Sequence, residues 1–266
     1  MLFRVLGPIQ VSDAGGAAVP IGARKVRMVL AVLLAGAGER VAASRLIDVL
    51  WEGEPPRSAT ANLHTYVWEL RRRLPVTRLG RPRIERDREG YRLTVGCGEF
   101  DAWVFGERTT QGRRELAEGR LAQGARSLAG ALELWRGAPY EDVAAAAPLE
   151  VARLLELRRL VQEDLMDARL HLGEHREVVD ELRVLTTAEP LRERPWAQLM
   201  LALYRCGRRA EALYAYQEVY RLLDAELGIQ PGNAIRELHR RILADDTSLG
   251  GGPPVFGHPA RPRQTA

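Results

Sequence analysis

The order of strand and helix patterns over residues 1–96 constrains the fold of this chain more than any single motif. Short runs of β-branched and apolar residues come first, three helical patterns follow, and a second pair of strands closes the segment. Gly90 lies in the turn of that last pair, as in a β-hairpin. The predicted strands cover two parts of residues 2–12, Ala18 to Ile21, and a hairpin over 82–95; the predicted helices cover 24–37, 45–51 and 58–74. This order is typical of a winged helix-turn-helix domain.

The third predicted helix has two distinct faces. Ser58 is its expected N-cap and Pro75 ends it, while Ser44 is the expected N-cap of the preceding helix. At 100° per residue, one face is mainly apolar: Ala59, Leu63, Tyr66, Val67, Leu70 and Leu74. The opposite face is mainly polar: Ala61, Asn62, Thr65, Trp68, Glu69 and Arg72, with His64 and Arg71 at its margin. We therefore expect one buried face and one face open to a partner.

From Phe100 onward the strand signals stop, and the sequence predicts helices only. Gly173 and Gly207 lie 34 residues apart, each followed by apolar or aromatic residues at offsets 5, 6, 9 and 12, and Gly119 begins a weaker copy. This is the period of tetratricopeptide repeats, which stack helical hairpins around a concave binding face. The predicted fold is therefore mainly α with small β elements: a winged helix-turn-helix over 1–96, an all-α tetratricopeptide-like domain over 97–244, and a disordered tail or linker over 245–266.

Charge is distributed unevenly between these parts. Residues 1–96 carry 16 Lys and Arg against 9 Asp and Glu, whereas residues 97–244 carry 21 against 24. A GC-rich genome would enrich arginine throughout the chain, but it would not change the sign of the net charge between two parts. A basic first domain joined to a mildly acidic second domain indicates an anion-binding module attached to something else.

These features favour duplex DNA as the anion. The major groove admits one helix, and the outer face of residues 57–73 offers short polar and forked side chains to base edges and phosphates. An ordinary surface helix with solvated charges would explain the third helix alone, but not the order of elements and the charge around it. The residues expected to contact DNA are Arg24, Lys25, Arg57, Ser58, Thr60, Asn62, His64, Thr65, Trp68, Arg71, Arg72, Arg73, Arg83, Arg86, Arg88 and Arg92.

Catalytic and metal-binding chemistry has weaker support. His171 and His175 match the H-x-x-E-H string of some zinc proteases, but the repeat glycine Gly173 separates them and no third ligand stands out. The sequence contains neither a phosphate-binding loop nor a G-x-S-x-G nucleophile elbow. We therefore expect no enzymatic activity, no cofactor and no metal.

Composition and the first residues indicate the compartment. Cys97 and Cys206 are too few for a disulfide scaffold. No apolar run approaches the ~20 residues of a membrane span, and residues 1–10 lack the features of a signal peptide. A soluble cytoplasmic protein is expected.

Strings in both parts resemble one bacterial regulator family. In the first part they are FRVLGPIQV, ARKVRMVLAVLL, LIDVLWEGEPPRSATANLHTYVWELRRRL and GYRL. In the second part they include ALELWRGAPYED, the run from EVARLLELRRL to AELGIQPG, and ELHRRIL. The first part resembles the response-regulator (two-component) type of winged helix, and residues 1–244 as a whole resemble the Streptomyces antibiotic regulatory proteins.

This resemblance implies a bacterial transcriptional activation domain over 100–244. It also implies a transcriptional activator that binds direct repeats at promoters as a head-to-tail homodimer and recruits RNA polymerase holoenzyme to antibiotic or secondary-metabolite genes. It places the recognition helix at Arg57–Arg73 and the wing at Arg83–Arg92. Some relatives continue into a nucleotide-binding switch domain, so the chain is either a short member or the N-terminal part of a longer one.

A second function stays open at this point. In a protein-interaction adaptor, the helical stack would do the binding and the basic module would dock to an acidic partner. Binding of the basic module to random duplex DNA at low salt would separate the two hypotheses.

Overall fold

The computed structural model describes residues 2–250, and the chain forms two compact units. The first unit contains the residues up to 110 together with 130–159, and the second contains 111–129 together with the residues from 160 onward. The unit boundaries fall within three helices, α4 (Asp101–Ala117), α5 (Leu121–Leu132) and α6 (Pro148–His171). The compact units therefore divide the chain differently from the two predicted sequence modules, which meet near residue 97.

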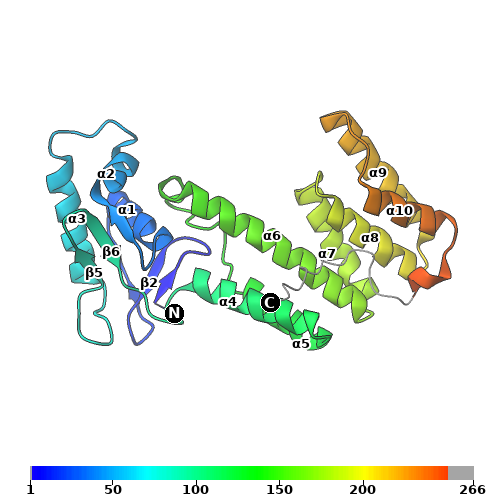
Figure 1. The fold of residues 1–266 in the computed structure, drawn as a ribbon, viewed down its shortest axis with the longest axis horizontal. Coiled ribbons are helices and arrows are strands. Elements are labelled where there is room, and N and C mark those ends of the chain that lie inside the picture. Colours follow the sequence, from blue (N-terminus) through cyan, green and yellow to red (C-terminus); the bar gives the residue numbers. More distant parts are fainter. Residues whose placement is uncertain (1, 251–266) are drawn as a thin grey trace, which may run out of the picture. The chain divides into compact units, whose positions relative to one another are not determined.

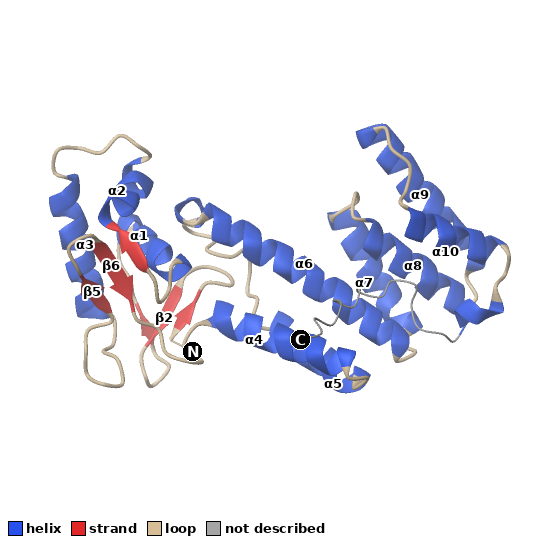
Figure 2. Ribbon diagram, in the orientation of Figure 1, coloured by secondary structure: helices blue, strands red, loops and turns tan. Residues whose placement is uncertain are grey.

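The first unit contains two small antiparallel sheets and a group of three helices, and one strand of the second sheet lies between the first two of these helices in sequence (Figure 1, Figure 2). One sheet has the order β1-β2-β3, formed by β1 (Phe3–Arg4), β2 (Gln10–Ser12) and β3 (Ala18–Val19). The helices are α1 (Arg24–Ala35), α2 (Ala43–Trp51) and α3 (Ala59–Arg73). The other sheet has the order β4-β6-β5, formed by β4 (Arg40–Ala42), β5 (Ile84–Arg86) and β6 (Gly90–Leu93). This arrangement confirms the predicted winged helix-turn-helix.

Strand β4 was not predicted. It pairs with β6, so that Val41 lies opposite Tyr91 and Ala42 lies opposite Gly90, and it turns the hairpin into a three-stranded sheet. A Cβ atom at Gly90 would collide with the carbonyl oxygen of Val41, so this close approach of two strands requires glycine. Three residues are too few to show a strand pattern in the sequence.

The two predicted N-caps have different outcomes. Ala42 is the N-cap of α2, and Ser44 lies inside the first turn, so the prediction for Ser44 is wrong. Ser58 is the N-cap of α3, as predicted, but its side chain makes no capping hydrogen bond. Its hydroxyl oxygen instead accepts a hydrogen bond from Asn62 Nδ2 at 3.2 Å.

The core of the first unit is built around α1. Seven consecutive residues of this helix, 28–34, are buried, and α1 contacts both α2 and α3. From α3, Leu63, Val67 and Leu70 complete this core. Burying a large apolar side chain contributes about 1.5–3 kcal/mol each, so this packing fixes the orientation of α3.

Hydrogen bonds tie the first sheet to the start of α4. The buried carboxylate of Asp101 accepts hydrogen bonds from the backbone N–H groups of Val5 at 2.8 Å and Leu6 at 3.1 Å. The N–H of Tyr140 donates to the carbonyl of Val5 at 2.8 Å. A buried N–H without a partner costs about 1–3 kcal/mol, so the winged helix depends on residues beyond 1–96 for its stability.

The second unit consists of helical hairpins. After α6 come α7 (His175–Ala188), α8 (Glu193–Arg205), α9 (Arg209–Leu227) and α10 (Asn233–Leu243). Gly119, Gly173 and Gly207 each lie in a turn between helices with positive φ, at +80°, +87° and +74°. This left-handed backbone favours glycine. The recurring glycine turn confirms the repeat predicted from the sequence, including its weaker copy.

A buried ionic cluster joins α6 to α8. The guanidinium of Arg194 contacts the carboxylates of Glu163 at 3.3 Å, Asp164 at 2.8 Å and Asp167 at 2.5 Å. All three acids are buried, and Arg113 of α4 also reaches Asp164 at 2.7 Å. Burial raises the pKa of Asp167, and the charge of Arg194 opposes that rise. The cluster therefore uses arginine as an internal structural cation.

The first residues of the segment predicted to be disordered are ordered in the structure. Residues 247–250 form a 3₁₀ turn, η2 (Thr247–Gly250), and Leu249 is buried. Arg205 donates a hydrogen bond to the carbonyl of Leu249 at 2.8 Å, and Arg241 pairs with Asp246 at 2.7 Å. Disorder is therefore wrong for 245–250, because these long-range partners hold the segment. Residues 251–266 lie outside the described part of the chain.

Candidate nucleic-acid interface

The predicted outer face of α3 is open. Ala61, His64, Thr65, Trp68 and Arg72 are exposed along this face, and Trp68 exposes 55% of its surface. Asn62 and Glu69, also predicted on this face, are half-buried. The division of α3 into a core face and an open face therefore follows the prediction, because a helix of this period buries a single stripe.

The start of α3 offers polar groups beside a helix N-terminus. Arg57, Ser58 and Thr60 are all exposed there. The N-terminus of a helix has unpaired N–H groups and a partial positive charge, which favour phosphate. Further along α3, the hydroxyl of Thr65 donates a hydrogen bond to the carbonyl of Ala61 at 3.1 Å. Thr65 therefore offers a partner its methyl group and the lone pairs of its hydroxyl oxygen.

Trp68 and Arg72 lie one turn apart and contact each other. The guanidinium carbon of Arg72 lies over the indole ring of Trp68, 4.8 Å from the ring centroid. Within the described residues, Arg72 makes no ion pair. Its hydrogen-bond donors are therefore available to an external acceptor.

The arginines on either side of Arg72 are bound within the protein. Arg71 Nε donates to the carbonyl of Ile84 at 2.9 Å, which ties the end of α3 to strand β5. Arg73 pairs with Glu69 at 2.8 Å and donates to the carbonyl of Pro20 at 2.9 Å. The sequence placed both residues among the DNA contacts, whereas the structure gives them intramolecular partners that position α3.

The wing is the hairpin β5–β6, and two of its acids form ion pairs with an arginine of a neighbouring strand. Arg40 of β4 pairs with Asp87 and with Glu89, each at 2.6 Å. The pKa of Asp87 is lowered chiefly by the hydrogen bond from the backbone N–H of Glu89, with a smaller contribution from the charge of Arg40. Two of the three acids of the hairpin are thus paired with a cation outside it, whereas the third, Glu85, is exposed and makes no ion pair within the described residues. Sequence reasoning missed Arg40, because it lies 47 residues before Asp87.

The wing arginines differ in their availability. Arg86, Arg88 and Arg92 are exposed and make no ion pair within the described residues, although the guanidinium of Arg86 lies 5.9 Å from the ring centroid of Tyr91. These three side chains can reach a phosphate backbone.

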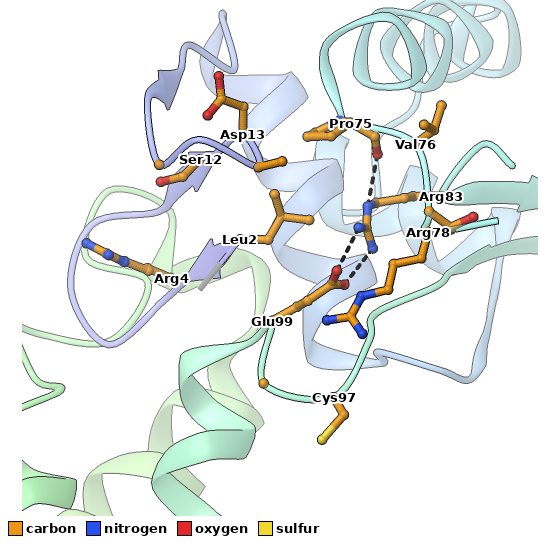
Figure 3. Close-up of a pocket in the computed structure, with 14 residues that line it drawn as sticks. Leu2, Arg4, Ser12, Asp13, Pro75, Val76, Arg78, Arg83, Cys97 and Glu99 are labelled. Atoms are coloured by element: carbon orange, nitrogen blue, oxygen red, sulfur yellow. Dashed lines mark hydrogen bonds and ion pairs between the residues drawn. The ribbon is translucent and has the colours of Figure 1, made fainter. Parts of the chain in front are cut away.

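Arg83 does not belong to this surface, and its prediction as a DNA contact is corrected here. Only 6% of the residue is exposed. Figure 3 shows its guanidinium held by Glu99, with bonds of 2.7 and 2.9 Å, and by the carbonyl of Pro75 at 2.9 Å. The hydrogen bond from Arg83 is the main cause that lowers the pKa of Glu99. An arginine that is buried and bidentate to a carboxylate is a structural cation.

The start of α1 has one available cation and two engaged ones. Arg24 is exposed. The ammonium of Lys25 lies 4.3 Å from the ring centroid of Trp51, and Arg27 pairs with Asp142 at 2.7 Å. Only Arg24 among these therefore resembles the available arginines of the wing.

The arrangement as a whole can bind a polyanion. Several arginines of the first unit are exposed and make no ion pair within residues 2–250: Arg24, Arg57, Arg72, Arg86, Arg88 and Arg92. The exposed groups His64, Thr65 and Trp68 lie among them on α3. Phosphate contacts position a protein on DNA, and short polar or aromatic side chains read base edges.

Other kinds of site have less support in the described part of the chain. No three His, Cys, Asp or Glu side chains gather there in a way that could hold a metal ion. His171 ends α6 and His175 begins α7, with the turn at Gly173 between them, so they do not share a helix. None of the helices described here has the length and apolar character needed to cross a membrane.

Comparison with known proteins identifies the family. The sequence model of one protein family, the bacterial transcriptional activator domain, matches residues 100–243 of this chain. The chain is 36% identical over 258 residues to the regulatory protein DnrI of Streptomyces peucetius, with 94% of both chains covered. It is 37% identical over 250 residues to the regulatory protein AfsR of Streptomyces coelicolor, covering 93% of this chain but only 24% of AfsR.

A solved structure shows the same architecture. The structure of Mycobacterium tuberculosis EmbR in complex with a low-affinity phosphopeptide matches with a TM-score of 0.84 at 34% identity, covering 91% of this chain and 65% of that one. EmbR is a transcriptional regulatory protein, and the relatives as a group are regulators rather than enzymes. The chain belongs to the Streptomyces antibiotic regulatory protein family of transcriptional regulators, with a winged helix followed by a bacterial transcriptional activator domain.

Proposed function

We propose that this protein is a sequence-specific DNA-binding transcriptional activator that uses the outer face of α3 and the wing to recognise promoter DNA. One observation carries the proposal: Arg57, Arg72 and the wing arginines 86, 88 and 92 are exposed and not ion-paired within the described residues, while the wing acids Asp87 and Glu89 are paired with Arg40. A surface of this kind attracts phosphates and releases their counterions.

The side chains divide into two roles. Arg57, Arg86, Arg88 and Arg92 contact phosphates and fix the position of α3 on the duplex. His64, Thr65, Trp68 and Arg72 face the major groove, where each base pair presents a distinct pattern of donors, acceptors and methyl groups. The wing then lies against the backbone or the minor groove.

For the assembly on DNA, we propose the arrangement that the family resemblance implies. Two copies bind direct repeats in head-to-tail orientation, and the helical second module aligns the neighbouring copy and contacts RNA polymerase holoenzyme. The genes controlled are those of antibiotic or other secondary-metabolite biosynthesis. Family membership supports this part of the proposal, and so does the stack of helical hairpins, an architecture suited to protein contacts.

Selection of bound duplexes from a random pool, with the full chain, tests the proposal. We expect enrichment of two copies of one half-site in the same orientation, about one helical turn (10–10.5 bp) apart, so that both copies lie on one side of the duplex. Enrichment of inverted half-sites would contradict the head-to-tail arrangement. A pool that stays random, with no gel shift at low salt, would contradict DNA binding and favour the adaptor.

Transcription in vitro tests activation separately. A promoter carrying the selected repeats should yield more transcript when the full chain is added to RNA polymerase holoenzyme. The double variant Arg72→Ala and Arg88→Ala should lose this gain along with DNA affinity. Binding without any gain in transcript would contradict the activator role.

A further inference from the structure

The apolar side chain of Trp68 is not packed into the core of the first unit. More than half of it is exposed, whereas Leu63 and Val67 on the opposite face of α3 are buried. Its one ring contact within residues 2–250 is the guanidinium of Arg72. A tryptophan that packs against a cation on a helix surface still has most of its ring available to a partner.

The contact with Trp68 also constrains Arg72. A guanidinium over an aromatic ring is held by cation–π attraction, so less rotamer freedom is lost when its donors later bind a ligand. Residues four apart on a helix lie on the same face, about 6 Å apart along the axis. The indole and the guanidinium thus lie side by side on the exposed face of α3, where they can contact two neighbouring base pairs, since these are stacked only ~3.4 Å apart.

We propose that Trp68 and Arg72 read one dinucleotide step together, a thymine next to a guanine on the same strand. The inference rests on the proposed function and names the part of the half-site that this pair recognises. Arg72 donates two hydrogen bonds to O6 and N7 of guanine, and the indole packs on the C5 methyl group of thymine. Trp68 is therefore both a direct contact and the positioning residue for Arg72.

This assignment explains why the two neighbouring arginines are unsuited to the same task. Arg71 and Arg73 are already bound to Ile84 and to Glu69 and Pro20, respectively. Within the described residues, Arg72 is the member of this run that makes no hydrogen bond or ion pair, and it lies beside an aromatic ring. The run of three arginines therefore supplies one base-reading side chain and two that hold the helix in place.

Parallel selections from one random duplex pool test the inference. The full chain should enrich a thymine–guanine step in each half-site. Arg72→Ala should lose the guanine preference, by about 5- to 100-fold, while keeping the rest of the half-site. Trp68→Ala should lose the thymine preference and also weaken that for guanine, because the guanidinium is no longer oriented. Arg126→Ala, a change of the same charge at an exposed position on α5, should leave the selected sequence unchanged.

Modified bases then isolate the two contacts. Replacing the selected thymine by deoxyuridine removes only the methyl group, and replacing guanine by 7-deazaguanine removes only the N7 acceptor. Deoxyuridine should weaken binding by the wild-type chain but not by Trp68→Ala. Likewise, 7-deazaguanine should weaken binding by the wild-type chain but not by Arg72→Ala. Circular dichroism should show that both variants are folded.

Two results would overturn the inference while leaving the proposed function intact. One is a selected half-site that Trp68→Ala and Arg72→Ala both recover with unchanged preferences. The other is equal sensitivity of wild type and variants to the modified bases. Failure of the wild-type chain to enrich any sequence would instead contradict the proposed function itself.

Discussion

The arginines of the winged helix and those of the helical stack differ in what surrounds them. On α3 and the wing, Arg57, Arg72 and Arg88 are exposed and make no ion pair within the described residues. In the second unit, Arg194 is surrounded by three buried carboxylates, and Arg169 is bound to Glu174 and Glu181 at 2.7 Å each. The same residue type is a binding group in one region and a structural cation in the other.

This difference shows that the number of arginines is a poor guide to function in a chain so rich in them. The residues 1–96 and 97–244 carry 16 and 21 Lys and Arg, so the count favours the helical part. What distinguishes the winged helix is the availability of the charges. Arg40 strengthens that distinction, because it occupies the wing acids and leaves the wing arginines available.

The largest expected effect is on stability, at Arg194. Arg194→Ala leaves Asp167 buried without its cation and Asp164 with Arg113 alone, and should lower the free energy of unfolding by about 3–5 kcal/mol. Urea unfolding followed by circular dichroism measures this loss. In the same assay Arg72→Ala should stay within about 0.5 kcal/mol of wild type, because the side chain is exposed. Similar losses in both variants would remove the distinction between the two regions.

The next effect is at Arg83, which lies in the winged helix but is a structural cation. Arg83→Met should lower stability by about 2–3 kcal/mol, because Glu99 loses a charged hydrogen bond. The pKa of Glu99 should rise toward its ordinary value, which NMR titration measures. Because the pKa of Glu99 is lower in the folded than in the unfolded state, its ionised form stabilises the wild-type fold at pH values above the unfolded-state pKa. As the pH falls through the folded-state pKa, this contribution is lost, so the difference in the free energy of unfolding between the variant and the wild type should shrink. An unchanged titration of Glu99 would show that the ion pair is not formed.

A smaller effect is expected at Arg88, on DNA binding alone. Arg88→Ala should leave stability unchanged and weaken binding to all duplexes alike. The slope of log affinity against log salt should decrease by about 0.9, the value for one lost phosphate contact. Fluorescence anisotropy at several KCl concentrations measures this slope. A loss confined to one base sequence would instead assign Arg88 to base reading.

The smallest effect is expected at Arg40. Arg40→Ala exposes the charges of Asp87 and Glu89 beside the wing arginines, so DNA affinity should fall by a few-fold although Arg40 is assigned no contact with DNA. Adding Asp87→Asn and Glu89→Gln to this variant should restore the affinity. A triple variant as weak as Arg40→Ala would show that Arg40 itself contacts the duplex.

Features set by local pattern could be predicted from the sequence. The order of strands and helices follows from short apolar runs, and the buried stripe of α3 follows from its period. The turns at Gly173 and Gly207 follow from a backbone conformation that favours glycine. Each of these depends on residues near one another in the chain.

Features set by distant partners could not be predicted from the sequence. The burial of Arg83 depends on Glu99, the pairing of the wing acids Asp87 and Glu89 depends on Arg40, and the fixed position of residues 245–250 depends on Arg205 and Arg241. An alternating strand pattern shows which arginines share a face, but not which of them meet a carboxylate. Sequence reasoning therefore predicted the exposed face of α3 and overestimated the number of arginines available on it and on the wing.

The salt dependence of DNA affinity tests the central claim most directly. Two triple variants of the full chain should be compared with wild type on one duplex: Arg57, Arg72 and Arg88 to Gln, and Arg126, Arg176 and Arg221 to Gln. Both remove three exposed arginines, the first from the proposed interface and the second from the helical stack. The first triple variant should reduce the salt slope by about 1.8, which is 0.9 for each of the phosphate contacts assigned to Arg57 and Arg88, and the second should leave it at the wild-type value. Equal slopes for the two triple variants would contradict the assignment of DNA binding to α3 and the wing.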